Sequence, residues 1–159
     1  MYRLFAAIAV PEDIGDELAG ELQTGLLCAS WRPQINFHVT LRFFGEISHE
    51  LAIDLDHALG EIEVSTFEIE LDGVGWFGRR SPTAIWARVR ETDALRSLSA
   101  QCERAARRLG LAAEKRPFVP HVTLAYLHDI PLEDVVQWAD RHKNYCLSLI
   151  HIPSPRDRG

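Results

Sequence analysis

The tetrapeptide His-Val-Thr-Leu occurs twice in this chain of 159 residues, at 38–41 and again at 121–124. Each copy alternates polar and apolar residues, which is the pattern of a half-buried β-strand. Residues two apart on a strand point to the same face. Each copy is therefore predicted to present an imidazole and a hydroxyl side by side on one face, and to bury its valine and leucine on the other.

Two interpretations of this repeat are open. Valine and threonine favour strands, so either copy alone is ordinary strand sequence. Strand propensity, however, gives no reason for a histidine at the same place in both copies. We therefore interpret four side chains as functional: His38 with Thr40, and His121 with Thr123.

Composition limits the partners and the compartment. The chain is 47% hydrophobic and 25% charged, as expected for a soluble globular domain. Its net charge of −6 argues against a broad nucleic-acid-binding surface, but leaves room for a local basic pocket. No apolar run reaches transmembrane length. The three widely spaced cysteines form no metal or redox motif. We therefore expect a cytoplasmic protein with reduced thiols.

Hydrophobic periodicity predicts two similar halves built from strands and helices. Ser48 and Thr92 are predicted to cap helices at their N-termini. A glycine-rich connection is expected at 73–78. The expected strands lie at 3–10, 36–44, 63–71, 83–90 and 118–127, and the expected helices at 11–27, 48–60, 93–109 and from Pro131 onward. Each motif thus follows a strand and a helix, which indicates two α/β lobes that face each other across a cleft.

Two histidines in one cleft have the chemistry needed for concerted acid–base catalysis. The ordinary pKa of imidazole is near neutrality, so one ring can accept a proton while the other donates one. Two threonine hydroxyls beside them can donate hydrogen bonds to the non-bridging oxygens of a phosphodiester. Those bonds would stabilise the charge that develops in the transition state. This chemistry needs neither a metal ion nor a nucleophilic serine or cysteine, so no cofactor is expected.

Segments around the two motifs make the chain similar to a known family. It resembles the 2H phosphoesterase superfamily, and within it the RNA 2′,3′-cyclic phosphodiesterases that are also called 2′-5′ RNA ligases. The resemblance covers about residues 2 to 144. Besides both motifs, it rests on 3–8 with Pro11, on Trp31, Pro33 and Asn36, and on 41–46, 75–77, 82–86 and 118–125.

The resemblance implies an α+β fold with two lobes related by a pseudo-twofold axis. Two antiparallel sheets flanked by helices would place both motifs in a central cleft. The implied reaction is hydrolysis of an RNA 2′,3′-cyclic phosphate to a 2′-phosphate. By the same resemblance, His38 is the proton donor, His121 is the proton acceptor, and Thr40 and Thr123 bind the phosphate. The expected partners are RNA ends or nucleotides with a cyclic phosphate. A monomer with no membrane attachment and no obligate protein partner is expected.

The chain departs from the family pattern after the second motif. Members commonly carry arginine two residues beyond the motif's fourth position, where this chain has Tyr126. A phenol donates one hydrogen bond but brings no charge. Arg32, Arg42 and Arg116 are candidates to supply the cation, so Arg42 and Tyr126 are included as further candidate phosphate-binding residues. An exposed strand position is the alternative interpretation of Arg42.

Two aromatic residues flank the first motif, Phe37 and Phe43. Both could stack a nucleobase. Aromatic side chains on strands are more often part of the core, however, and we expect that placement for both.

Three alternatives to this hypothesis are considered. A metal site made of His38, His121 and either Glu46 or Asp129 is disfavoured, because the sequence lacks the helical histidine spacing of common metal motifs. The second alternative is a phosphodiesterase for another small cyclic phosphate or a 2′-5′-linked nucleotide. The third is a non-catalytic module that binds RNA or nucleotides.

The C-terminal residues 147–159 do not show the strands with which the family would continue. We interpret 1–146 as a single bilobal domain whose C-terminal strands are missing, and 147–159 as a non-native tail. The segment 147–152 resembles the translated end of a sequencing adapter.

Overall fold

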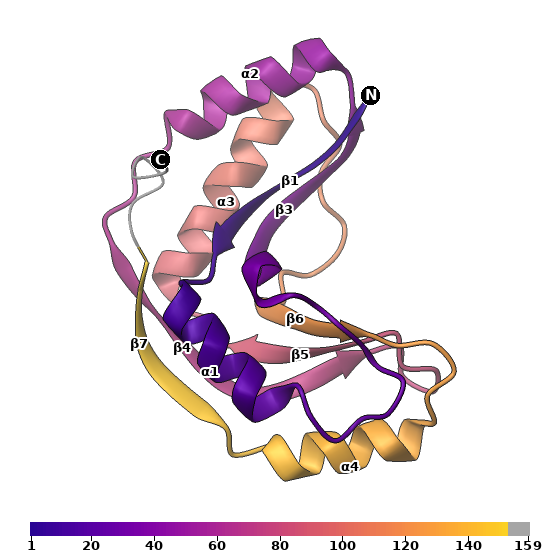
Figure 1. Cartoon of the computed structure of the whole chain (residues 1–159). Coiled ribbons are helices and arrows are strands. Elements are labelled where there is room, and N and C mark those ends of the chain that lie inside the picture. Colours follow the sequence, from indigo (N-terminus) through magenta and orange to yellow (C-terminus); the bar gives the residue numbers. More distant parts are fainter. Residues whose placement is uncertain (153–159) are drawn as a thin grey trace.

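A computed structural model of the chain describes residues 1–152 (Figure 1). Strands and helices alternate along this part of the chain. In order, they are β1 (Tyr2–Ala9), α1 (Glu12–Leu22), β2 (Ser30–Trp31), the 3₁₀ helix η1 (Gln34–Asn36), β3 (His38–Ile47), α2 (His49–Gly60), β4 (Phe67–Phe77), β5 (Ala84–Val89), α3 (Asp93–Arg108), β6 (His121–Tyr126), α4 (Leu132–His142) and β7 (Cys146–Ile152). Within residues 1–152, no helix combines the length and the apolarity needed to cross a membrane.

The strands form one antiparallel sheet in the order β1-β3-β6-β5-β4-β7, and β2 pairs with β6. A single residue pair, Val39 with Val122, joins β3 to β6. The sheet therefore has two arms, one made of β1 and β3 and the other of β6, β5, β4 and β7. Figure 1 shows the first arm running across the direction of the second. The expected α+β fold with antiparallel strands is confirmed, and the two expected sheets are the two arms.

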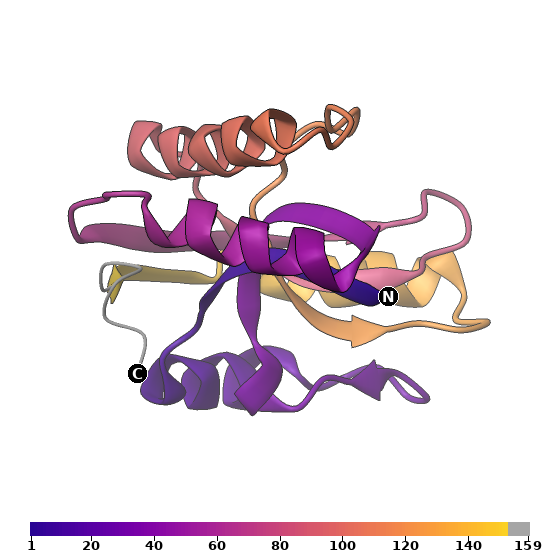
Figure 2. The same cartoon turned by 90° about the horizontal axis from the view of Figure 1, so that it is seen from above.

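Each half of the chain contains the same succession of elements, a strand, a helix and then a motif strand. These are β1-α1-β3 in the first half and β5-α3-β6 in the second. In Figure 2, α3 and α1 lie on opposite sides of the strands. The α3 helix packs on β3 and against α2. On the other side, the indole Nε1 of the fully buried Trp138 in α4 donates to the carbonyl of Leu22 at the end of α1, at 3.0 Å. The duplication predicted from the two motifs therefore extends to the elements around them.

The predicted N-caps are both present. The Ser48 hydroxyl accepts a hydrogen bond from the amide of Leu51, and the Thr92 hydroxyl accepts one from the amide of Leu95, each at 3.2 Å. The first helix, in contrast, ends at residue 22 rather than 27. Gly25 has a φ of +81°, a left-handed conformation that cannot continue a helix.

The glycine-rich segment belongs to a strand and is not the flexible connection that we predicted. Gly73 and Gly75 lie inside β4. The register with β5 shifts between Leu71 and Val74, so Gly73, with a φ of +81°, is part of a β-bulge. Glycine in a strand commonly marks such a bulge or a close approach of a neighbour.

A strand near the C-terminus was also missed. Residues 146–152 form β7, which pairs with β4 at the edge of the sheet. The apolar residues of this stretch favour a strand, and the outer edge of β4 offers it unpaired backbone groups. Whether residues 147–159 are native stays a prediction, and 153–159 lie outside the described residues.

Candidate active site

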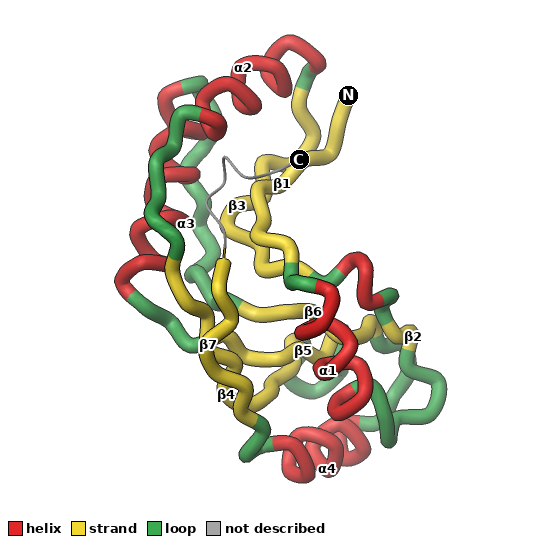
Figure 3. Tube along the Cα trace, turned by 60° about the vertical axis from the view of Figure 1, so that its left-hand side comes forward, coloured by secondary structure: helices red, strands yellow, loops and turns green. Residues whose placement is uncertain are grey.

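The two motif strands lie side by side at the junction of the two arms (Figure 3). Val39 and Val122 are paired and are 1% and 0% exposed, so both point into the core. The histidine and threonine of each motif are half-buried and lie on the opposite face. Because β3 and β6 are antiparallel, each histidine lies next to the threonine of the other motif. The sequence prediction that the four side chains share one face agrees with this arrangement.

Both imidazole rings are held in the same way. The Nδ1 atom of His38 lies 2.6 Å from the carbonyl oxygen of Asn36, and the Nδ1 atom of His121 lies 2.6 Å from the carbonyl oxygen of Val119. A carbonyl only accepts hydrogen bonds, so each Nδ1 carries the hydrogen. Each neutral ring therefore keeps an unprotonated Nε2 on its far side, which can exchange a proton with a substrate or water.

The two histidines differ in their surroundings. Burial lowers the pKa of His121 below its ordinary value, the hydrogen bond with Val119 opposes this effect, and the nearby His38 adds to the lowering. The last contribution is the repulsion that a proton on His121 would meet from the charge of His38. His121 is therefore neutral at neutral pH, the state that a proton acceptor requires.

Aromatic rings surround both histidines, and sequence reasoning missed their part in the site. The ring of Phe5 stacks on that of His38, with centroids 5.0 Å apart. Phe77 and Trp86 contact His121, at 5.0 and 5.5 Å between centroids. Their signal in the sequence was weak, because an aromatic residue on a strand is most often a core residue.

The leucine of each tetrapeptide causes a register shift. Thr40 pairs with Ala7 and Arg42 with Ala6, so Leu41 is an extra residue in β3. In β6, Thr123 pairs with Trp86 and Ala125 with Ile85, which makes Leu124 the extra residue. Such a bulge moves every later side chain to the other face of the strand.

The bulges determine which residues reach the face of the histidines. The fifth residue after each histidine is on that face: Phe43 in β3 and Tyr126 in β6, 43% and 48% exposed. Tyr126 thus lies on the face of the histidines, and its role in phosphate binding stays a prediction. The core placement expected for Phe43 is wrong because the side chain is exposed, and its ring contacts that of Phe5, with centroids 5.5 Å apart. Phe37, 2% exposed, is in the core as expected.

Arg42 is placed differently from the expectation. The bulge turns it away from the face of the histidines, and it is 8% exposed. Its guanidinium donates to the carboxylate of Glu103 in α3 and to the carbonyls of Phe43 and Ala112. These internal partners use its donors to join β3 to the helix layer, so we no longer include Arg42 among the candidate phosphate-binding residues.

Arginines lie over the two exposed aromatic rings at either end of the motif strands. The guanidinium carbon of Arg32 is 5.3 Å from the ring centroid of Tyr126, and that of Arg116 is 5.5 Å from the ring centroid of Phe43. Arg88, the exposed register partner of His121, is a further cation that sequence reasoning did not single out.

Within residues 1–152, no group of three or more metal-ligating side chains comes together.

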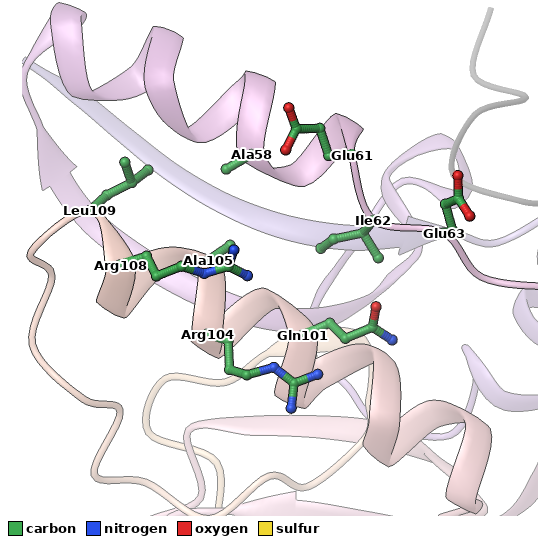
Figure 4. Close-up of a pocket in the computed structure, with 9 residues that line it drawn as sticks. All are labelled: Ala58, Glu61, Ile62, Glu63, Gln101, Arg104, Ala105, Arg108 and Leu109. Carbon is green, nitrogen blue, oxygen red and sulfur yellow. The ribbon is translucent and has the colours of Figure 1, made fainter.

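The hollow between α2 and α3 is not part of this site. It has a volume of about 410 Å³ and is lined by Ala58 of α2, by residues 61–63 that follow this helix, and by side chains of α3 and its end, as Figure 4 shows. Neither motif contributes a residue to it. The four motif side chains lie instead at the open junction of β3 and β6.

Comparisons with known proteins identify the family of the chain. The sequence matches the model of the 2′-5′ RNA ligase superfamily over residues 10–150. A relative from Thermotoga maritima, named RNA 2′,3′-cyclic phosphodiesterase, is 27% identical over 164 residues, which are 92% of this chain and 87% of that protein. A relative of the same name from Escherichia coli is 33% identical over 126 residues, which are 77% of this chain and 70% of that protein.

Solved structures give the same picture for the fold. The crystal structure of E. coli LigT complexed with 3′-AMP is similar, with a TM-score of 0.69 and 27% identity over 92% of this chain and 83% of that one.

Some relatives are longer, since the chain spans 52% of the length of the protein from Aeropyrum pernix and 35% of that from Geobacillus stearothermophilus. From the match over residues 10–150 and these relatives, we conclude that the chain belongs to the 2′-5′ RNA ligase superfamily.

Proposed function

We propose that this protein hydrolyses RNA 2′,3′-cyclic phosphates to 2′-phosphomonoesters without a metal ion. The observation that carries the proposal is the matched pair of imidazoles. Each has its Nδ1 held at 2.6 Å by the carbonyl two residues earlier, on two adjacent strands. The pairing fixes two Nε2 atoms on one face, as concerted acid–base catalysis requires. The relatives named RNA 2′,3′-cyclic phosphodiesterases support the substrate class.

In the proposed reaction, water attacks the phosphorus of the cyclic phosphate. His121 accepts a proton from this water through Nε2, and its lowered pKa supports this role. The bond between phosphorus and the 3′ oxygen breaks, and protonated His38 donates its Nε2 proton to the departing oxygen. The product is a 2′-phosphate with a free 3′ hydroxyl, and the two histidines have exchanged protonation states.

The threonine hydroxyls bind the phosphate oxygens in this proposal. Within residues 1–152, neither the hydroxyl of Thr40 nor that of Thr123 has a hydrogen-bond partner in the protein, so both hydroxyls can donate to a ligand. Their position beside the histidines fits donors to the two non-bridging oxygens, whose charge increases in the transition state. The enzyme would act as a monomer on RNA ends or nucleotides.

One assay tests the proposal. The protein is incubated in EDTA with a nucleoside 2′,3′-cyclic phosphate and with an oligonucleotide that ends in one, and phosphorus NMR identifies the product. We expect full activity and a 2′-phosphate. A 3′-phosphate would contradict the acid–base assignment, and activity lost in EDTA would contradict metal independence. Binding without turnover would favour the non-catalytic alternative.

A further inference from the structure

Two arginine–aromatic pairs occupy equivalent places in the two arms. Arg32 lies over Tyr126, and Arg116 lies over Phe43. Both rings belong to the fifth residue after a motif histidine and are about half exposed. A guanidinium that stacks on a ring keeps its edge free for a bidentate contact with an anion. Each pair is therefore a place where a phosphate group could bind.

Only one of the two arginines has its charge available. The Arg116 side chain donates to both carboxylate oxygens of Glu114, at 3.3 and 3.4 Å, and this contact lowers the pKa of Glu114. Arg32 is half-buried and has no carboxylate partner among the described residues. In a chain of net charge −6, Arg32 is thus a cation without a local counter-charge beside the motif strand.

The backbone of Arg32 is fixed to the second motif. Its amide donates to the carbonyl of Leu124 at 2.8 Å. The side-chain amide of Gln23 donates to the carbonyls of both Arg32 and Leu124, at 2.8 and 3.0 Å. These contacts hold the backbone of Arg32 in one place relative to Thr123 and Tyr126, so little ordering of the backbone is needed when a ligand binds.

The position of Arg32 differs from that of the reacting phosphorus. Tyr126 is three residues beyond Thr123, which corresponds to roughly 10 Å along the strand. That distance exceeds the size of one phosphate group and matches the separation of two anionic groups on one substrate. On an RNA end that carries a 2′,3′-cyclic phosphate, the next phosphate is the one on the 5′ oxygen of the same nucleotide.

We propose that Arg32, held over the ring of Tyr126, binds the 5′-phosphate of the terminal nucleotide and so makes the enzyme selective for RNA ends over nucleosides with a single cyclic phosphate. The inference rests on the proposed function for its substrate class. It makes Arg32 a specificity-determining residue, outside the proton transfers of the two histidines.

The test compares a nucleoside 2′,3′-cyclic phosphate with the same compound bearing a 5′-phosphate. For the wild type, we expect a lower KM for the doubly phosphorylated probe at similar kcat. Arg32→Ala should raise the KM for that probe about 10- to 100-fold, as expected for a lost charge-assisted hydrogen bond, and should leave the KM for the other probe unchanged. Arg32→Lys should restore part of the difference, because lysine keeps the charge but loses the bidentate geometry.

Two variants serve as comparisons. Arg107→Ala removes one charge from the exposed side of α3 and should change neither KM. Arg116→Ala should reduce the preference for the 5′-phosphate less than Arg32→Ala does. An equal effect of Arg32→Ala on both probes, no effect on either, or a larger effect of Arg116→Ala would overturn the inference.

Failure of the proposed function would be visible separately. If the wild type turned over neither probe, the proposed function would fail, and the dissociation constants of both probes, measured by calorimetry, would still test Arg32. A 5′-phosphate that strengthens binding to the wild type but not to Arg32→Ala supports the inference. A 5′-phosphate without effect on wild-type affinity refutes it.

Discussion

Gly75 of β4 makes room for the indole of Trp86, and replacing it with alanine tests whether that ring positions His121. A Cβ at residue 75 would lie 2.3 Å from Cη2 of Trp86 and 2.7 Å from both Cζ2 and Cζ3. The indole would have to move by about 1 Å to reach an ordinary contact distance. Trp86 is 7% exposed and contacts Phe77 and His121, so the movement would be transmitted to the catalytic ring.

Gly75→Ala is expected to lower both the stability and the activity of the protein. Overpacking of a well-filled site lowers the free energy of unfolding by about 1–3 kcal/mol, which corresponds to a fall in Tm of roughly 2–12 °C for a chain of this size. Displacing a catalytic group by about 1 Å lowers kcat by up to roughly 100-fold. Tm is measured by calorimetry and kcat with a cyclic nucleotide as substrate.

The chain offers a matched control and an internal rescue. Gly20 lies in α1 with no atom near the place of its missing Cβ, so Gly20→Ala should leave kcat unchanged and stabilise the helix by about 0.5–1 kcal/mol. Combining Gly75→Ala with Trp86→Ala removes the clash, so the glycine substitution should cost less free energy of unfolding in that background. A Gly75→Ala variant with wild-type Tm and kcat would refute the reasoning.

Three further predictions concern the site and its support. His38→Ala and His121→Ala should each lower kcat by about 10²- to 10⁴-fold at unchanged circular dichroism, and a single variant near the wild-type rate would exclude the two-histidine mechanism. Because His121 must be neutral and its pKa is lowered, activity should fall as the pH drops through a value below the ordinary 6.5; an acidic limb of the kcat/KM profile at or above 6.5 would contradict this assignment. Arg42→Ala removes the cationic partner of the Glu103 carboxylate, which keeps only the hydrogen bond from the amide of Glu114, and should reduce the free energy of unfolding by about 2–4 kcal/mol, less than for a fully buried pair because Glu103 is 26% exposed; urea denaturation measures it, and an unchanged midpoint would refute it.

Sequence patterns identified the motif strands because His-Val-Thr-Leu has the two-residue period of a half-buried strand, and they identified the caps at Ser48 and Thr92. They misplaced Arg42 and Phe43, and one feature of the structure accounts for where both residues lie. Strict alternation puts the fourth residue after a histidine on its face, whereas the bulge at Leu41 puts the fifth residue there. A bulge depends on how the neighbouring strand pairs, and that pairing has no local signal in the sequence.

The contacts made by aromatic and glycine residues could not be predicted from the sequence either. Gly75 was interpreted as part of a flexible connection, although its missing side chain is what admits Trp86. The sequence limited the candidates for a cation near Tyr126 to three arginines, but it could not show which of them contacts the ring. That choice depends on β2 pairing with β6, which brings Arg32 to the ring across a long separation in sequence.

The single Val39–Val122 pair has a mechanical consequence for catalysis. The proposed acid belongs to one arm of the sheet and the proposed base to the other, so no bond within either motif determines the distance between them. That distance follows from the angle at which the arms meet, and one pair of backbone partners restrains an angle weakly. A phosphate bound by a threonine from each arm would link the two arms and restrain the angle between them. The bound substrate would then help to set the distance between the two histidines that proton transfer requires.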